Sequence, residues 1–146
     1  SDVYKRQVKK CMFKDGILLN NTVVDLDKTE TLDFVLSTFR SEFKNIYYFF
    51  DKELVEKTGI KITNLYVLVT DKREIKNLKI DYNQIPQVLR KRVISTLGNI
   101  KKYETKDYSR YVIIDEMNNY SHLFAKSMSS FRKLISTSIP SRILIN

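Results

Sequence analysis

The apolar positions at the start of the chain fall into short runs that are separated by turn residues. Apolar runs lie on both sides of Lys14-Asp15-Gly16, and Asp-Gly between such runs is a strong hairpin signal. Asn20-Asn21 predicts a second turn, which another apolar run follows. The pattern therefore predicts a β element over residues 8–26.

The spacing of apolar residues changes from Leu32 onward. They recur at intervals of three and four residues, which is typical of one face of a helix: Leu32, Leu36, Phe39, Phe43, Ile46 and Phe50. Asp27 and Glu30 resemble a capping box at the start of this helix, and Gly59 is a suitable stop. We therefore expect one long helix over about residues 28–57.

The remainder of the chain mixes helical and extended patterns. Residues 65–70 are compatible with a strand or a short helix, and residues 111–114 with a strand. Pro86 suits the first turn of a helix that runs to about Tyr103, and another helix is predicted over about residues 119–136. Gly98, inside the first of these helices, indicates close packing there.

The fold class that follows is α+β, mainly α. An N-terminal β hairpin element is expected to precede a helical bundle that takes in residues 27–146. No linker or internal repeat divides the chain, so residues 8–146 are expected to form a single domain.

Composition limits the chemistry of this protein. The chain has 146 residues, of which 42% are hydrophobic, with one cysteine and one histidine. An internal disulfide, a cysteine-based zinc site and a histidine-rich metal site are therefore excluded, and we expect no cofactor. No apolar run approaches the roughly 18 residues of a membrane span, so no membrane partner is expected. A net charge of +9 favours a polyanionic partner.

The two ends of the chain have unusual sequences. Residues 2–7 resemble the in-frame translation of an adapter used in preparing sequencing libraries, and we expect residues 1–7 to be a non-natural tail. The C-terminal end stops directly after the apolar run Ile143-Leu144-Ile145. We therefore expect the chain to be a fragment of a longer protein.

Acidic residues offer one candidate catalytic site. Asp115 and Glu116 follow an apolar run, as in nucleotide-hydrolysing enzymes, but none of the three glycines opens a phosphate-binding loop. The same pair together with Asp71, which also follows an apolar run, could instead form a metal-dependent nuclease site. Acidic residues at strand ends are more often simply solvated, so this nuclease is kept as an alternative.

Basic residues interleaved with tyrosines indicate a nucleic-acid-binding surface. The candidate residues lie on and after the helix that Pro86 begins: Arg90, Lys91, Arg92, Lys101, Lys102, Tyr103 and Arg110. Such residues can follow a phosphate backbone and stack on bases. The alternative is a solvated charged face with tyrosines half in the core.

Residues 85–103, which read IPQVLRKRVISTLGNIKKY, resemble a helix of TnpB-like transposon proteins. The family pattern is Pro-Ser-x-Leu-Arg-Arg-x-x-Ile, followed by Gly-x-Val-x-Ser-Tyr, and this chain has one residue fewer before Gly98. The family consists of RNA-guided DNA endonucleases, whose N-terminal lobe grips guide RNA and the guide–target duplex. Its catalytic carboxylates belong to a later RuvC-like domain, so none is carried onto this chain.

The resemblance implies a prokaryotic, cytoplasmic protein that binds RNA or an RNA–DNA duplex without catalysing a reaction by itself. The alternative from another class is a small helical protein-interaction module, such as a phage accessory protein. The guide, the target and the oligomeric state do not follow from these residues.

Overall fold

The computed structural model describes residues 2–71, 75, 80–105, 107, 109–114 and 119–138. Within these residues the elements occur in the following order: α1 (Asp2–Cys11), β1 (Leu18–Asp25), α2 (Thr29–Arg40), β2 (Asn45–Phe50), α3 (Lys52–Thr58), β3 (Ile62–Thr70), the 3-10 turn η1 (Tyr82–Gln84), α4 (Gln87–Gly98), β4 (Lys101–Lys102), the 3-10 turn η2 (Ser109–Tyr111) and α5 (Asn119–Ser138).

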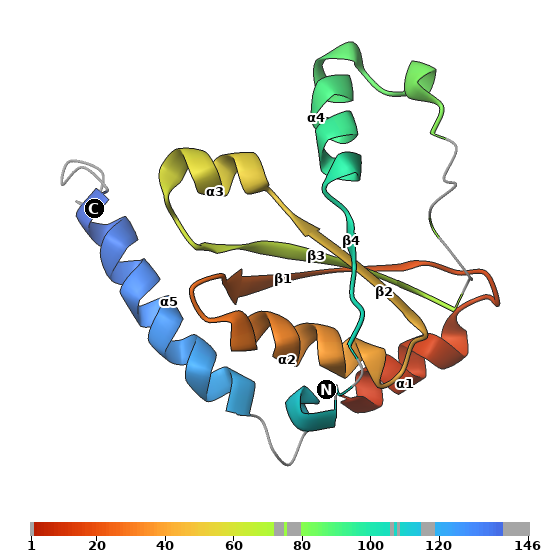
Figure 1. Ribbon diagram of the computed structural model, residues 1–146, viewed down its shortest axis with the longest axis horizontal. Coiled ribbons are helices and arrows are strands. Elements are labelled where there is room, and N and C mark those ends of the chain that lie inside the picture. Colours follow the sequence, from red (N-terminus) through yellow and green to blue (C-terminus); the bar gives the residue numbers. More distant parts are fainter. Residues whose placement is uncertain are drawn as a thin grey trace, which may run out of the picture.

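The strands form one antiparallel sheet in the order β1-β3-β2-β4. Strand β3 lies between β1 and β2, which are joined through α2, so these elements form a split β-α-β unit. Its central register pairs Val67 with Asn20 on one side and with Tyr48 on the other. Figure 1 shows α2, with α1 and α5 beside it, on one side of the sheet, whereas α4 projects from the other side.

The hydrophobic core lies between α2 and the face of the sheet that it covers. Its members alternate along the strands, as half-buried sheets require, and repeat at helical spacing on α2. They are Val24, Val35, Leu36, Phe39, Phe43, Ile46, Leu65, Val67 and Val69. The architecture is therefore mixed α+β, as expected, but it is a helix-covered sheet instead of a helical bundle.

Polar side chains define where the helices of this unit begin and end. Thr31, which is fully buried, accepts from the backbone N–H of Asp25 and donates to carbonyl oxygens in the turn before α2. Asp51 accepts from the backbone N–H of Leu54 at 2.9 Å and so caps α3. Gly59 ends α3 with φ at +70°, a left-handed conformation that favours glycine.

The predicted capping box at Asp27 and Glu30 is not used, because α2 begins after Lys28 without a side-chain cap.

The predicted N-terminal hairpin is wrong. Residues up to Cys11 belong to α1, and Asn20-Asn21 lies inside β1 instead of forming a turn. Gly16 does close a tight turn, since its N–H donates to the carbonyl of Phe13 at 2.8 Å. However, β1 pairs with β3, which lies about forty residues further along the chain, and not with a neighbouring strand.

The predicted long helix over residues 28–57 is also wrong, because it divides into α2, β2 and α3. The residues of β2 are mostly aromatic, and such side chains favour strands over helices. The apolar residues that suggested one long helix therefore belong to two different elements. Leu32, Leu36 and Phe39 lie on α2, whereas Ile46 and Phe50 reach the same core from the sheet.

Other expectations are confirmed. Pro86 precedes α4, and α5 begins at Asn119. Residues 65–70, for which the sequence left a strand and a short helix open, belong to strand β3. By contrast, α4 ends at Gly98, where an added Cβ would meet no atom within 4 Å, so close packing does not explain this glycine. The strand expected over residues 111–114 does not form, because Tyr111 ends a 3-10 turn and only Ile114 makes an isolated bridge. Among the described residues, no helix combines the length and the apolar character needed to cross a membrane.

The segment that resembles an adapter translation lies within α1. Lys5 places its ammonium 4.9 Å from the centre of the Phe39 ring, and Arg6 lies 3.6 Å from the carboxylate of Glu42. Arg6 is exposed whereas Lys5 and Glu42 are half-buried, and single contacts of these kinds contribute about 1 kcal/mol or less to stability. Whether residues 1–7 belong to the natural protein stays a prediction.

Candidate nucleic-acid interface

The three adjacent basic residues of α4 lie in different environments. None of the residues of α4, all of which the structure describes, is buried. Arg90 donates from Nε to the carbonyl of Ile85 at 3.0 Å and so braces the turn before the helix. Arg92 donates to the carboxylate of Asp51 at 2.8 Å. Lys91 is exposed, and within the described part of the chain it has no acidic partner.

The contact between Arg92 and Asp51 links α4 to the beginning of α3. The pKa of Asp51 is lowered, first by the hydrogen bond from the backbone N–H of Leu54 and then by the hydrogen bond from Arg92. Because both groups lie at the surface, this ion pair contributes little to holding α4 in place. Apart from this ion pair, the described residues of α4 have few contacts with the other helices and strands.

The two lysines of β4 face opposite sides of the sheet. Lys101 pairs with Tyr48, which faces the core side, and Lys102 pairs with Tyr47, which faces the α4 side. Lys102 lies 3.0 Å from the carboxylate of Glu104 in an exposed ion pair. Only Lys102 of the pair therefore shares a face with the side of the sheet from which α4 projects.

Tyr103 belongs to the packing of the fold and is not available for stacking on a base. Its backbone N–H donates to the carbonyl of Ile46 at 2.8 Å, and its ring contacts the core. Its hydroxyl lies 2.9 Å from that of Ser37 and donates to Asp33 at 3.4 Å. Burial raises the pKa of Tyr103, and the negative charge of Asp33 adds to this effect.

The raised tyrosine pKa values predict a loss of stability at high pH. Burial raises the pKa of Tyr48, Tyr103 and Tyr120 above the ordinary value of 10.0. The unfolded chain therefore ionises first, so this contribution to stability is complete below about pH 10 and is lost as the pH rises further. We expect the free energy of unfolding, measured in urea from about pH 8 to about pH 11, to fall above pH 10.

The matched variants for this measurement are Tyr103→Phe and Tyr82→Phe. The first removes one half-buried hydroxyl whose pKa is raised, and it should make the fall above pH 10 shallower. The second removes the hydroxyl of a tyrosine that is 39% exposed, and it should leave the fall unchanged. An equally steep fall for the two variants would contradict a contribution of Tyr103 to the loss of stability above pH 10.

Arg110 lies apart from the other basic candidates. It follows the β4 segment on η2, which packs against α2, and its guanidinium lies 5.7 Å from the centre of the Tyr111 ring. That ring meets Phe34 of α2 edge-on at 5.5 Å. Figure 1 shows η2 beside α2, on the opposite side of the sheet from α4. The structure therefore divides the predicted basic residues between two surfaces.

A groove between the sheet and α4 was not predicted from the sequence. Its volume is about 380 Å³, and its floor includes Phe49 of β2 and Tyr66 of β3, whose rings stack at 4.9 Å with an angle of 13°. The opposite wall is formed by Leu89, Val93 and Leu97 of α4. We call this feature the α4 groove. The aromatic run over residues 47–50 would have indicated this groove only if the run had been recognised as a strand.

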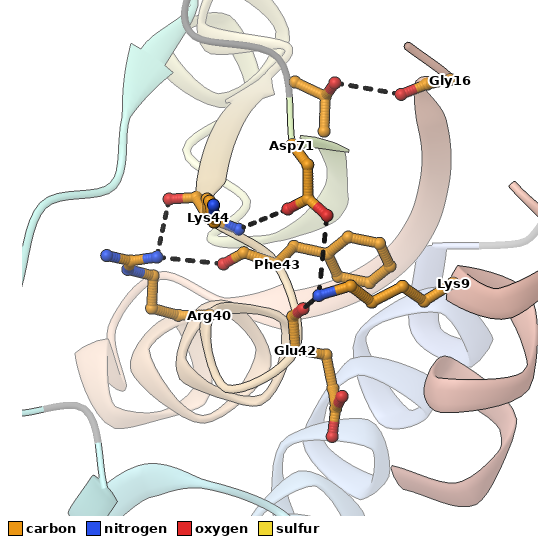
Figure 2. A network of polar contacts seen from close by, with 8 residues as sticks. Lys9, Gly16, Arg40, Glu42, Phe43, Lys44 and Asp71 are labelled. Carbon is orange, nitrogen blue, oxygen red and sulfur yellow. Dashed lines mark hydrogen bonds and ion pairs between the residues drawn. The ribbon is translucent and has the colours of Figure 1, made fainter. Parts of the chain in front are cut away.

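Asp71 has a structural role in the turn between α2 and β2. It accepts from the backbone N–H of Lys44 at 3.0 Å, and Lys9 lies 3.6 Å from its other carboxylate oxygen (Figure 2). Lys9 also donates to the carbonyl of Glu42. Arg40 donates to the carbonyls of Phe43 and Lys44 in the same turn (Figure 2). The network joins α1, the turn after α2 and the end of β3.

The other residues of the predicted nuclease site, Asp115 and Glu116, lie outside the described residues. Among the residues that the structure does describe, no group of three or more histidine, cysteine, aspartate or glutamate side chains is placed to hold a metal ion. Cys11, the cysteine of this chain, is exposed at the end of α1.

Comparison of the chain with models of known protein families, with curated proteins and with solved structures gives no match.

Proposed function

We propose that this protein binds nucleic acid without catalysing a reaction, through the side of the sheet from which α4 projects. The observation that carries the proposal is the position of basic residues around an aromatic floor. Lys91 and Arg92 lie on α4, and Lys102 faces the same side of the sheet as the stacked rings of Phe49 and Tyr66. Basic side chains bind phosphates, and adjacent aromatic rings accept bases.

The charge of the whole chain supports the same proposal. An excess of nine positive charges attracts a polyanion at long range and speeds association. We propose RNA, alone or paired with DNA, as the ligand. Membership of the TnpB-like family, which implied this ligand, remains a proposal that rests on residues 85–103.

The experiment that tests the proposal measures how RNA affinity depends on salt. The double variant Lys91→Gln/Lys102→Gln should weaken binding to all sequences and reduce the log–log salt slope by about 0.7 for each phosphate that the protein no longer neutralises. Arg90 and Arg92 are left unchanged, because their hydrogen bonds to Ile85 and Asp51 also position α4.

The control variant Lys10→Gln/Lys14→Gln removes the same charge from exposed positions at the end of α1 and the turn that follows it. It should keep the original slope, because α1 lies on the opposite side of the sheet (Figure 1). Equal slopes for both double variants would show that only overall charge matters. Failure of the unmodified protein to bind RNA near physiological salt would overturn the proposal.

A protein-interaction role is the second candidate function, and exposed apolar residues of α4 favour it. Val88 is 85% exposed and Ile94 is 55% exposed, and exposed apolar side chains on one helix can contact a protein partner. If the protein instead binds a protein partner, it should bind nucleic acid only at low salt, through its overall positive charge. The same titration therefore separates the two candidates.

A further inference from the structure

The stacked pair Phe49–Tyr66 is presented by the sheet itself. The two residues are direct cross-strand partners of β2 and β3 and lie on the face away from α2. Both rings are half-buried, and they border the α4 groove instead of the core. The two rings already stack on one another, so a further ring can meet only an outer face or the edges of this pair. Regular strands hold this platform more rigidly than a flexible loop would.

The wall opposite this platform is apolar and does not close over it. Leu89 on α4 is still 46% exposed although it lines the groove with Val93 and Leu97. A volume of about 380 Å³ lies within the range of small-ligand sites. The space therefore fits one flat ring system between the aromatic platform and the helix.

The charges that line the groove balance one another. Asp51 and Glu53 oppose Lys52 and Arg92, with Arg92 bound to Asp51 and Lys52 in an ion pair with Glu56. A neutral guest is therefore favoured inside, because the lining of the groove offers a phosphate no net positive charge. Unbalanced positive charge lies outside, at Lys91 of α4.

We propose that the α4 groove takes an unpaired nucleobase, which stacks against the Phe49–Tyr66 pair while the phosphates on either side lie near Lys91 and Lys102. The inference deepens the proposed function and rests on it, because it makes single-stranded nucleic acid the preferred form of the ligand. A base held in a duplex keeps its own stacking partners and does not enter the groove. Stacking does not read the sugar, so RNA and DNA single strands share this chemistry.

A tryptophan at position 66 would report stacking directly. The chain has no tryptophan, so Tyr66→Trp places a single fluorophore in the floor of the groove and keeps an aromatic ring there. We expect single-stranded RNA or DNA oligonucleotides to quench its fluorescence, and a blunt duplex of the same sequence to leave it nearly unchanged. Quenching by neither single strand, in a sample that binds them, overturns the inference.

Removal of the ring measures its contribution to affinity. Tyr66→Ala should weaken single-strand binding at least about fivefold, whereas Tyr66→Phe should retain it, because base–aromatic stacking needs the ring and not the hydroxyl. The control Tyr82→Ala removes a ring that is 39% exposed on η1, outside the lining of the groove, and it should leave affinity unchanged. Circular dichroism establishes that each variant is folded.

The outcomes separate this inference from the proposed function. If Lys91→Gln/Lys102→Gln weakens binding but Tyr66→Ala does not, the phosphate contacts stand and the base pocket is overturned. If the unmodified protein binds duplex as tightly as single strands and Tyr66→Trp is not quenched, the pocket is likewise overturned. If no nucleic acid binds near physiological salt, both proposals fail. Should Tyr66→Ala not fold, the quenching of Tyr66→Trp still decides.

Discussion

Replacement of Phe39 or Phe43 with alanine is expected to lower the free energy of unfolding by about 3–5 kcal/mol, which would leave little or no folded protein. Phe39 on α2 is 4% exposed, and Phe43 in the turn after α2 is 2% exposed. Both pack among the core residues between α2 and the sheet, so each substitution leaves a cavity there.

Urea unfolding followed by circular dichroism measures this effect. The matched control is Phe13→Ala, because Phe13 is 90% exposed and the same atoms are removed without creating a cavity. The control should change stability by less than about 0.5 kcal/mol. Near-neutral results at both Phe39 and Phe43 would mean that this face is exposed, which would favour a protein-interaction surface.

Introduction of a carboxylate at the centre of the sheet is expected to have an equally large effect. Val67 lies on β3, between β1 and β2, and its side chain is fully buried against the α2 side. Val67→Asp would place an unpaired ionisable group there, at a cost of several kcal/mol. We therefore expect the variant to show no cooperative unfolding transition.

Asn64→Asp is the control, because it introduces the same residue into the same strand. Asn64 is exposed and lies on the opposite face of β3, where it pairs with Val23. A carboxylate there stays in water, so the free energy of unfolding of Asn64→Asp should remain close to that of the unmodified protein. Comparable losses for the two variants would contradict the alternation of β3 and, with it, the position of the core.

The sequence predicted individual basic residues of the candidate site but not how they are arranged. Local sequence placed Lys91, Arg92 and Lys102 on or near one helix, and the structure brings them to the same side of the sheet. Tyr103 was assigned to the same surface because it is adjacent in sequence, but alternation along the strand turns it towards Ser37 and the core. The α4 groove could not be predicted, because its floor depends on the pairing of Phe49 with Tyr66.

The helix boundaries and helical faces that the sequence alone determined are those with local signals. Pro86 starts α4, Gly59 stops α3, and helical spacing over the last described segment predicts α5. Each of these signals acts within a few residues, through backbone conformation or through a single helical face. For that reason they need no knowledge of what lies across the fold.

Only the tertiary structure decided the sheet. The apolar residues of β2 continue the helical spacing of α2, and both of its faces are covered, so no alternation distinguishes it from a helix. The partner of β1 is a strand about forty residues away, although Asp15-Gly16 favours a local hairpin. Pairing with β3 prevails because it buries Val24, Leu65 and Val67 against α2, and that gain from burial is non-local.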